Sequence, residues 1–141
     1  MQFELDEVTK AVRETARRFA EEKLAPQYQS REVDGRFDRD LLLEMGALGL
    51  IAPDLPEQLG GISAPGLTQG VVIEEIGRGD INVAYVQLLG SLIGGVMAEH
   101  APDELAAEAV MGIAEGRLLP ALGLTEPRGG TDAANLQLRA R

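Results

Sequence analysis

The chain contains no cysteine, which excludes disulfide bonds, thiolate metal sites and thiol nucleophiles. Tryptophan is also absent, and aromatic residues make up only 4% of the sequence. The core must therefore be built from Ala, Leu, Val and Ile, a composition that favours helices.

Basic residues are scarce, with 13 Lys and Arg against 23 Asp and Glu, and the net charge is −10. A nucleic-acid footprint needs clustered Lys and Arg. The one local group, Arg17, Arg18 and Lys23, alternates with acidic residues, as on a solvated helix face. We expect no nucleic-acid partner.

Long apolar segments are missing as well. No run of about 18 apolar residues is present, so we expect no membrane span. The first ten residues are acidic and lack the apolar region of a secretory signal. A cytoplasmic location is compatible with these absences and is our expectation. The 141 residues, 45% of them hydrophobic and 26% charged, suit a globular protein with a real core.

Apolar spacing and capping residues predict about five helices. Their ranges are 6–28, 38–48, 67–77, 81–100 and 102–116. The buried stripe of the first helix is predicted to be Val8, Val12, Ala16, Phe19, Ala20 and Leu24, with Pro26 disturbing its last turn. The second helix buries Leu41, Leu42, Met45 and Leu48 and stops at Gly49.

Capping residues mark where two of these helices begin. Asp38 caps the second helix, and Phe37 staples onto Leu42. Asp80 caps the fourth helix, which is apolar on nearly every side and is therefore expected to be central. Its small residues, Gly90, Gly94 and Gly95, allow a close neighbour. Residues 51–66 hold three Pro and three Gly and predict a structured loop.

The pattern changes after residue 116. The segments "RLLPALGL" (117–124) and "ANLQLRAR" (134–141) fit β-strands. The predicted fold is therefore mainly α: an N-terminal helical domain, residues 1–117, is followed by the start of a β-domain, residues 118–141.

Isolated polar residues give few candidates for catalysis or metal binding. His100, the only histidine, sits where a helix C-terminal cap is expected. Glu74 and Glu75 point about 100° apart on a helix and are interpreted as surface charge. We assign no catalytic residue and no metal ligand.

The segment "LTEPRGGTD", residues 124–132, is the strongest candidate site. Gly129 and Gly130 can expose successive backbone N–H groups to an anion, and the Thr131 hydroxyl adds a donor. Thr125 could bond the polar edge of a flat ligand while Leu122 and Leu124 contact its apolar part. A tight β-turn without a ligand explains the same residues equally well.

This segment, as "GLTEPRGGTD", resembles the T-E-P-x-x-G-S-D signature of the acyl-CoA dehydrogenases. Three other stretches resemble that family in the same order: "LLLEMGALGLIAPDLPEQLGG", "VVIEEIGRGDINVAY" and "AEGRLLPALGLTEP". The resemblance extends over essentially the whole chain.

The resemblance implies a helical domain, a middle β-domain and a C-terminal four-helix bundle, with this chain ending before the bundle. It implies FAD as cofactor, an acyl-CoA thioester desaturated between its α and β carbons, an electron-transfer flavoprotein as acceptor, and a homo-oligomer. Carried over by position, Leu122, Leu124 and Thr125 line the flavin, and Gly130 and Thr131 bind the pyrophosphate. Arg128 departs from the family pattern, which usually has a small or polar residue there. The family's catalytic base, a Glu of the bundle, lies beyond residue 141.

Two alternatives remain open. One is another enzyme on the same scaffold, an acyl-CoA oxidase or a flavin-dependent monooxygenase. The other is a non-enzymatic helical module that dimerises. For the chain by itself we expect no dehydrogenase activity and at most weak FAD binding.

Overall fold

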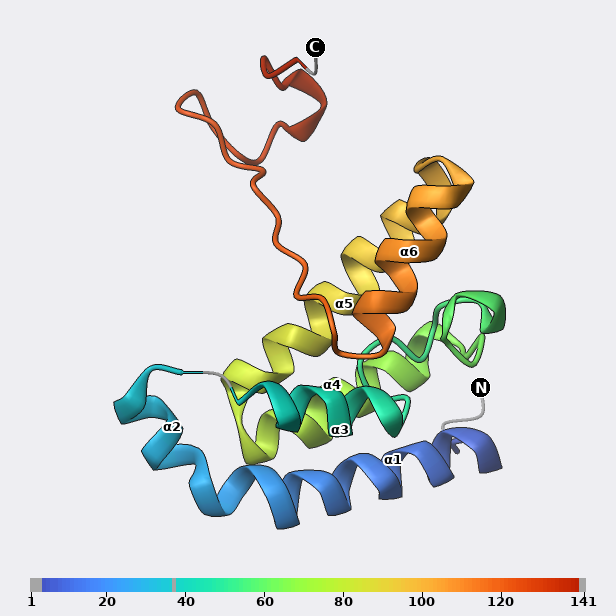
Figure 1. The fold of residues 1–141 in the computed structure, drawn as a ribbon, viewed down its shortest axis with the longest axis vertical. Coiled ribbons are helices and arrows are strands. Elements are labelled where there is room, and N and C mark those ends of the chain that lie inside the picture. The colour runs from blue at the N-terminus through green and yellow to red at the C-terminus, as the bar shows by residue number, and fades with distance from the viewer. Residues whose placement is uncertain (1–3, 37, 140–141) are drawn as a thin grey trace.

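The structure, a computed structural model, describes residues 4–36 and 38–139, and its elements are almost all helical (Figure 1). The α-helices are α1 (Glu7–Phe19), α2 (Tyr28–Asp34), α3 (Arg39–Ala47), α4 (Gly66–Gly79), α5 (Ile81–His100) and α6 (Asp103–Ala114). The mainly α class is confirmed. The predicted staple between Phe37 and Leu42 involves a residue outside the described ranges.

The first predicted helix is present but bends where Pro26 was expected to disturb it. Asp6 caps α1 by accepting from the Thr9 N–H at 2.7 Å. Beyond Phe19 the chain continues as a π-turn, Ala20–Leu24, and a 3₁₀ turn, Ala25–Gln27. The following helix, α2, was not predicted. None of its residues is buried. A helix without a buried face lacks the apolar periodicity from which the other helices were predicted.

The buried stripe predicted for residues 6–28 is confirmed from Ala16 to Leu24. Ala16, Phe19, Ala20 and Leu24 are buried. The prediction for Val8 is wrong, since its side chain is 60% exposed. Thr9 is buried instead, and its hydroxyl lies 2.8 Å from that of Thr68 on α4. A buried hydroxyl needs a partner, and Thr68 provides it.

α3 begins after its predicted cap, Asp38, and ends at Ala47, one residue before the predicted end. The Asp38 carboxylate accepts from the Asp40 N–H at 2.9 Å, and Leu41, Leu42 and Met45 are buried. Leu48 was expected inside but is 43% exposed, because the helix already ends at Ala47. Leu50 and Ile51, in the structured loop that follows, are buried in the core.

The backbone of α3 packs directly against the backbone that ends α6, with no side chain between them. A Cβ on Gly46 would meet the Glu115 carbonyl and lie 2.8 Å from the Gly116 nitrogen. Gly116 has φ +74°, and a Cβ there would meet the Leu42 carbonyl. No side chain fits at either position, so both glycines are required for this contact.

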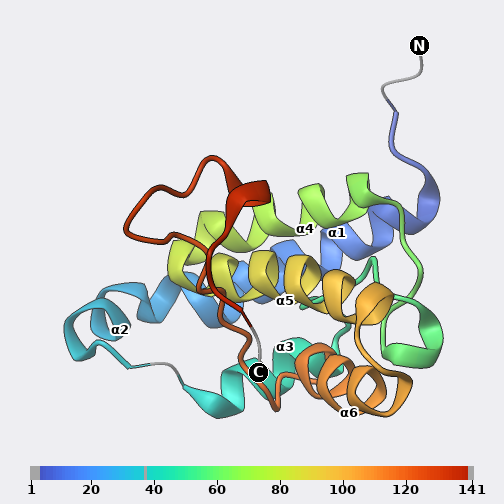
Figure 2. The same ribbon diagram turned by 90° about the horizontal axis from the view of Figure 1, so that it is seen from above.

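α5 lies between α4 and α6, which confirms its predicted central position (Figure 2). The close approach expected at its glycines occurs at Gly90 and Gly94. A Cβ on Gly90 would lie 2.6 Å from the Ile51 side chain, and one on Gly94 would lie 2.9 Å from Leu55. Gly95 faces open space.

One face of α5 remains uncovered. Its exposed apolar side chains recur at steps of three and four residues: Ile81, Tyr85, Leu88, Leu92 and Val96. α5 is also long and apolar enough to cross a membrane, with a mean hydropathy of 1.6. The absence of a long apolar run had predicted no such helix. A core helix can be equally long and apolar, and α5 packs against helices on two sides.

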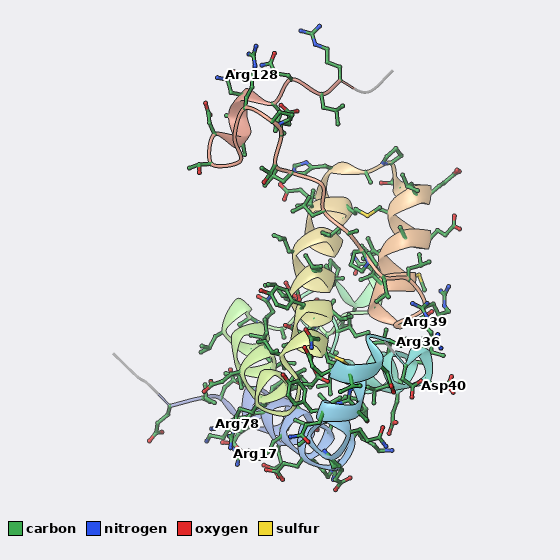
Figure 3. The ribbon with its side chains drawn as sticks, turned by 90° about the vertical axis from the view of Figure 1, so that its left-hand side faces the viewer. Arg17, Arg36, Arg39, Asp40, Arg78 and Arg128 are labelled. Atoms are coloured by element: carbon green, nitrogen blue, oxygen red, sulfur yellow. The ribbon has the colours of Figure 1, made fainter. Side chains whose placement is uncertain are left out.

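The interpretation of Glu74 and Glu75 as surface charge is wrong for Glu75. Glu75 is only 2% exposed, whereas Glu74 is exposed. Three guanidinium groups bond the Glu75 carboxylate: Arg13 at 2.7 Å, Arg17 at 3.0 Å and Arg78 at 3.2 Å. Arg17 and Arg78 lie on the same side of the molecule (Figure 3). This cluster ties α1 to α4.

A second buried carboxylate holds α2 in place. Asp80 is 2% exposed and caps α5 by accepting from the N–H groups of Asn82 and Val83, as predicted. Its second oxygen accepts from Arg31 Nε at 2.8 Å, and Arg31 also donates to the Leu24 carbonyl. The start of α5 is thereby bonded to α2.

The two predicted strands are not formed within the described residues. Residues 117–124 are irregular, and the only β-bridge described past α6 joins Glu126 to Gly129. Ala133–Asn135 forms a 3₁₀ turn inside the second predicted strand. A strand needs a partner for its backbone N–H and C=O groups, and the described residues supply none here.

We expect Glu75→Gln to lower the free energy of unfolding by about 2 kcal/mol, because charge-assisted hydrogen bonds inside the protein are lost while the shape is kept. Urea unfolding followed by circular dichroism measures this. The matched control is Glu74→Gln, whose side chain is exposed, and we expect it to change stability by less than about 0.5 kcal/mol. Equal effects for the two variants would contradict the role given to Glu75.

The same cluster gives a pH dependence. The hydrogen bond from Arg17 lowers the pKa of Glu75, with a further contribution from Arg13, while burial opposes them. A carboxylate with a lowered pKa stabilises the fold above its ordinary pKa, and that stabilisation is lost as pH falls through the lowered value. We therefore expect the stability difference between wild type and Glu75→Gln to shrink on acidification below about pH 4.

We expect Gly46→Ala to destabilise the protein by about 2 kcal/mol or more, because its methyl group would press on the backbone at the end of α6. Gly95→Ala is the control, since it also lies inside a helix but faces open space. The better helix propensity of Ala should stabilise that variant by about 0.5–1 kcal/mol. Thermal unfolding distinguishes the two, and a stabilised Gly46→Ala would disprove the close contact.

Candidate functional site

The candidate site lies on the segment that leaves the helical body after α6. Leu118 turns back onto α6, where its N–H donates to the Gly112 carbonyl at 2.8 Å. The chain then runs away from the helices toward its C-terminal end, where Arg128 is found far from the arginines of the helical body (Figures 1 and 3). Residues 126–138, here called the site loop, form the end of this segment.

The site loop starts with a tight turn. Glu126 and Gly129 exchange two backbone hydrogen bonds, from Glu126 N to Gly129 O at 3.1 Å and from Gly129 N to Glu126 O at 3.0 Å. Pro127 and Arg128 occupy the corner positions, and Pro restricts φ to a value that suits a turn. Gly129 has φ +149°, a conformation that favours glycine. The β-turn considered from the sequence is therefore present.

The turn brings two of the predicted site residues together. A Cβ on Gly130 would lie 2.7 Å from Thr125 Oγ1 and 3.3 Å from its methyl group. Any larger residue at 130 would displace the Thr125 side chain. Thr131 follows directly and is exposed. The backbone N–H groups of Gly130 and Thr131 bond no acceptor within residues 4–36 and 38–139.

This donor set suits an anion. Two successive free N–H groups and two nearby hydroxyls offer hydrogen bonds of the kind that phosphate groups accept. Arg128 adds one positive charge beside the turn, where it lines a shallow cavity of about 210 Å³ together with Glu126 and Asp132. The N–H groups of Gly130 and Thr131 and the two hydroxyls fit one side of a pyrophosphate site, and Arg128 offsets part of the negative charge of Glu126 and Asp132.

Leu122 and Leu124 precede the turn and are 53% and 38% exposed. Two residues apart in an irregular segment, they present apolar surface without enclosing a pocket. The five predicted site residues follow one another along one segment, and Thr125 faces Gly130 across the turn.

Glu126 was not among the predicted site residues. Its carboxylate accepts from the backbone N–H groups of Gln137, at 2.9 and 3.1 Å, and of Leu138, at 2.8 Å. The bond from Gln137, then that from Leu138, lowers the pKa of Glu126 below its usual range. No spacing rule points to a contact across 11 residues of loop, so sequence reasoning had no signal for it.

The remaining candidates stay outside the site. His100 ends α5 as predicted, exposed and 3.9 Å from the Glu99 carboxylate. Within the described ranges no group of three or more His, Asp or Glu side chains could hold a metal ion.

Comparison with known proteins bears on this arrangement. The family model described as "Acyl-CoA dehydrogenase, N-terminal domain" matches residues 6–117. The short-chain specific acyl-CoA dehydrogenase of Megasphaera elsdenii is 30% identical over 141 residues, covering 97% of this chain and 37% of that protein. The mitochondrial short-chain specific acyl-CoA dehydrogenase of Rattus norvegicus is 30% identical over 139 residues, covering 98% of this chain and 34% of that protein.

Solved structures share the fold. Butyryl-CoA dehydrogenase from Megasphaera elsdenii matches with a TM-score of 0.82 and 30% identity over 97% of this chain and 37% of that one. A chain from a structure of the electron transferring flavoprotein of Acidaminococcus fermentans matches with a TM-score of 0.87, 30% identity and coverages of 97% and 36%. The FAD complex of PigA matches with a TM-score of 0.85, 25% identity and coverages of 97% and 37%.

The chain thus spans little more than a third of the length of the relatives and structures it matches. The family match begins at Asp6, the cap of α1, and runs beyond the end of α6. It confirms the resemblance carried by the sequence motifs. The chain belongs to the acyl-CoA dehydrogenase family.

Proposed function

We propose that this chain provides the helical domain, residues 1–117, and the first FAD-binding segment, residues 118–141, of an FAD-dependent acyl-CoA dehydrogenase. The observation that carries the proposal is the close contact between Thr125 and Gly130, next to free N–H groups at Gly130 and Thr131. In this role Thr125 hydrogen-bonds the flavin ring, and Gly130 and Thr131 bind the pyrophosphate.

The chemistry follows from these positions. FAD, when bound, supplies the oxidant for desaturation of an acyl-CoA thioester between its α and β carbons. The Thr125 hydroxyl would orient the ring, and the N–H groups of Gly130 and Thr131 would donate hydrogen bonds to the phosphate oxygens. Leu122 and Leu124 cover the apolar part of the ring and exclude water from it.

No residue of this chain is assigned as the catalytic base. Glu75 is unsuitable because three arginines hold its carboxylate inside the helical domain. Glu126 is unsuitable because its oxygens already accept two backbone N–H groups. We infer from the family pattern that the base belongs to a part of the enzyme outside these 141 residues.

Relatives support the substrate class and the electron acceptor. Two relatives are short-chain specific acyl-CoA dehydrogenases, and one solved neighbour is a butyryl-CoA dehydrogenase. A matching chain comes from a structure of an electron transferring flavoprotein. We infer from them an acyl-CoA substrate and an electron-transfer flavoprotein as acceptor. The cytoplasmic location is a separate proposal that rests on the sequence.

The uncovered face of α5 supports an assembly larger than this chain. Its five apolar side chains are between 36% and 58% exposed and form one continuous stripe. Apolar stripes of this length normally pack against another surface. We infer that further parts of the enzyme or its homo-oligomer cover the face.

FAD binding by the chain can be measured by ¹⁵N NMR, which detects weak complexes. We expect FAD to shift the amide signals of Gly130 and Thr131, with a dissociation constant near the millimolar range, about −4 kcal/mol. Thr125→Val should weaken binding roughly tenfold through the loss of one hydrogen bond. Gly130→Ala should weaken it at least as much, because its methyl group would displace Thr125.

Two matched controls accompany this titration. Thr15→Val changes a threonine of α1 whose hydroxyl only bonds the Ala11 carbonyl. Gly95→Ala changes a glycine of α5 with open space around it, away from the proposed site. Both should bind FAD like wild type. Binding that is unaffected by Thr125→Val and Gly130→Ala would refute the assigned roles.

Activity provides a separate test. We expect the chain by itself to show no acyl-CoA-dependent bleaching of flavin absorbance, because it lacks a base and the second side of the site. Replacing the matching segment of the Megasphaera elsdenii enzyme with residues 1–141 should give a chimera that retains FAD and desaturates a short-chain acyl-CoA. A chimera that folds but neither holds FAD nor turns over would argue against the proposed function.

A further inference from the structure

Glu126 connects the two ends of the site loop through one residue. Its backbone closes the turn with Gly129 at the start of the loop. Its side chain reaches the end of the loop, where the carboxylate accepts from the N–H groups of Gln137 and Leu138 at 2.8–3.1 Å. Gly130 and Thr131 lie in the stretch between these two attachments.

Few other contacts hold this loop. Asp132 accepts from the Asn135 N–H at 3.1 Å and from its side-chain amide at 3.2 Å, which closes only the local 3₁₀ turn. Apart from Glu126 and Gly130, the described residues of the loop are all exposed, so no apolar core stabilises it. The bonds to Glu126 are the only long-range hydrogen bonds described within the loop.

We propose that Glu126 is a positioning residue of the cofactor site: its carboxylate clamps the returning chain at Gln137 and Leu138 and so holds the Gly130 and Thr131 N–H groups ready for a pyrophosphate. The identity of the bound group rests on the function proposed above, whereas the clamp itself does not. Glu126 acts through the backbone and not on the reacting atoms.

A carboxylate suits this role better than a neutral amide. Oε1 accepts from both Gln137 and Leu138, and Oε2 accepts from Gln137 as well. A Gln at this position would keep one uncharged acceptor oxygen and would turn its NH₂ group, a donor, toward the Gln137 N–H. Charge-assisted bonds to backbone N–H groups are also stronger than neutral ones.

Protonation of Glu126 should open the clamp. The groups that share its cavity with a charge are Arg128 and Asp132. The lowered pKa of Glu126 means that the clamp is fully present above the ordinary pKa of a glutamate and is lost as pH falls through the lowered value. The amide signals of Gln137 and Leu138 should report this transition directly.

The test compares ¹⁵N-labelled wild type with Glu126→Gln, using all 141 residues. The control is Glu104→Gln, which changes an exposed glutamate of α6. In wild type we expect the Gln137 and Leu138 amides to titrate together with a pKa below that of an ordinary Glu. In Glu126→Gln this titration should vanish and exchange of both amides with solvent should accelerate roughly tenfold. The helices should be unchanged, and Glu104→Gln should behave as wild type.

Ligand binding is then measured with FAD and, separately, with inorganic pyrophosphate. We expect Glu126→Gln to weaken both about tenfold, as judged by shifts of the Gly130 and Thr131 amides. Intact amide exchange at Gln137 and Leu138 in Glu126→Gln would overturn the clamp. Faster exchange with unchanged affinity would overturn the positioning role.

The two probes separate this inference from the proposed function. If wild type binds pyrophosphate but not FAD, the proposed function fails, and the pyrophosphate affinities of wild type and Glu126→Gln decide on the positioning role. If wild type binds neither probe, both the site assignment and the positioning role are overturned.

Discussion

The backbone contact between α3 and the residues that end α6 fixes where the chain leaves the helical body. Gly46 and Gly116 are the residues that allow it, because a Cβ on either would collide with the facing backbone. The positive φ of Gly116 then turns the chain out of α6. Sterics at these two glycines thus decide where the segment that carries the candidate site leaves the helical body.

Buried carboxylates fasten the N-terminal helices to this core. Glu75 on α4 binds arginines of α1, and Asp80, at the start of α5, binds Arg31 of α2. In a chain with a net charge of −10, several of the scarce arginines are therefore engaged inside the helical domain. The same principle recurs in the site loop, where Glu126 accepts backbone N–H groups. Each of these three carboxylates holds structure together, and none of the three is assigned as a base.

Much of the helical domain could be predicted because its signals are local. Asp80 caps a helix that runs from Ile81 to His100, as its sequence pattern indicates. The site residues could be named from their motif, but their geometry could not. Gly130 must lack a side chain because Thr125 faces it in the structure. The sequence pattern alone was explained equally well by a simple turn.

The sequence by itself determined where most helices begin and end, since capping, glycine and apolar periodicity act over a few residues. Tertiary structure decided the rest. It buried Glu75 rather than Glu74, because α1 brings arginines to only one of them. It left residues 117–124 without strand pairing, because a strand is stable only beside a partner. It also joined Glu126 to Gln137 and Leu138, a contact that depends on how the loop closes in space and leaves no mark in local sequence.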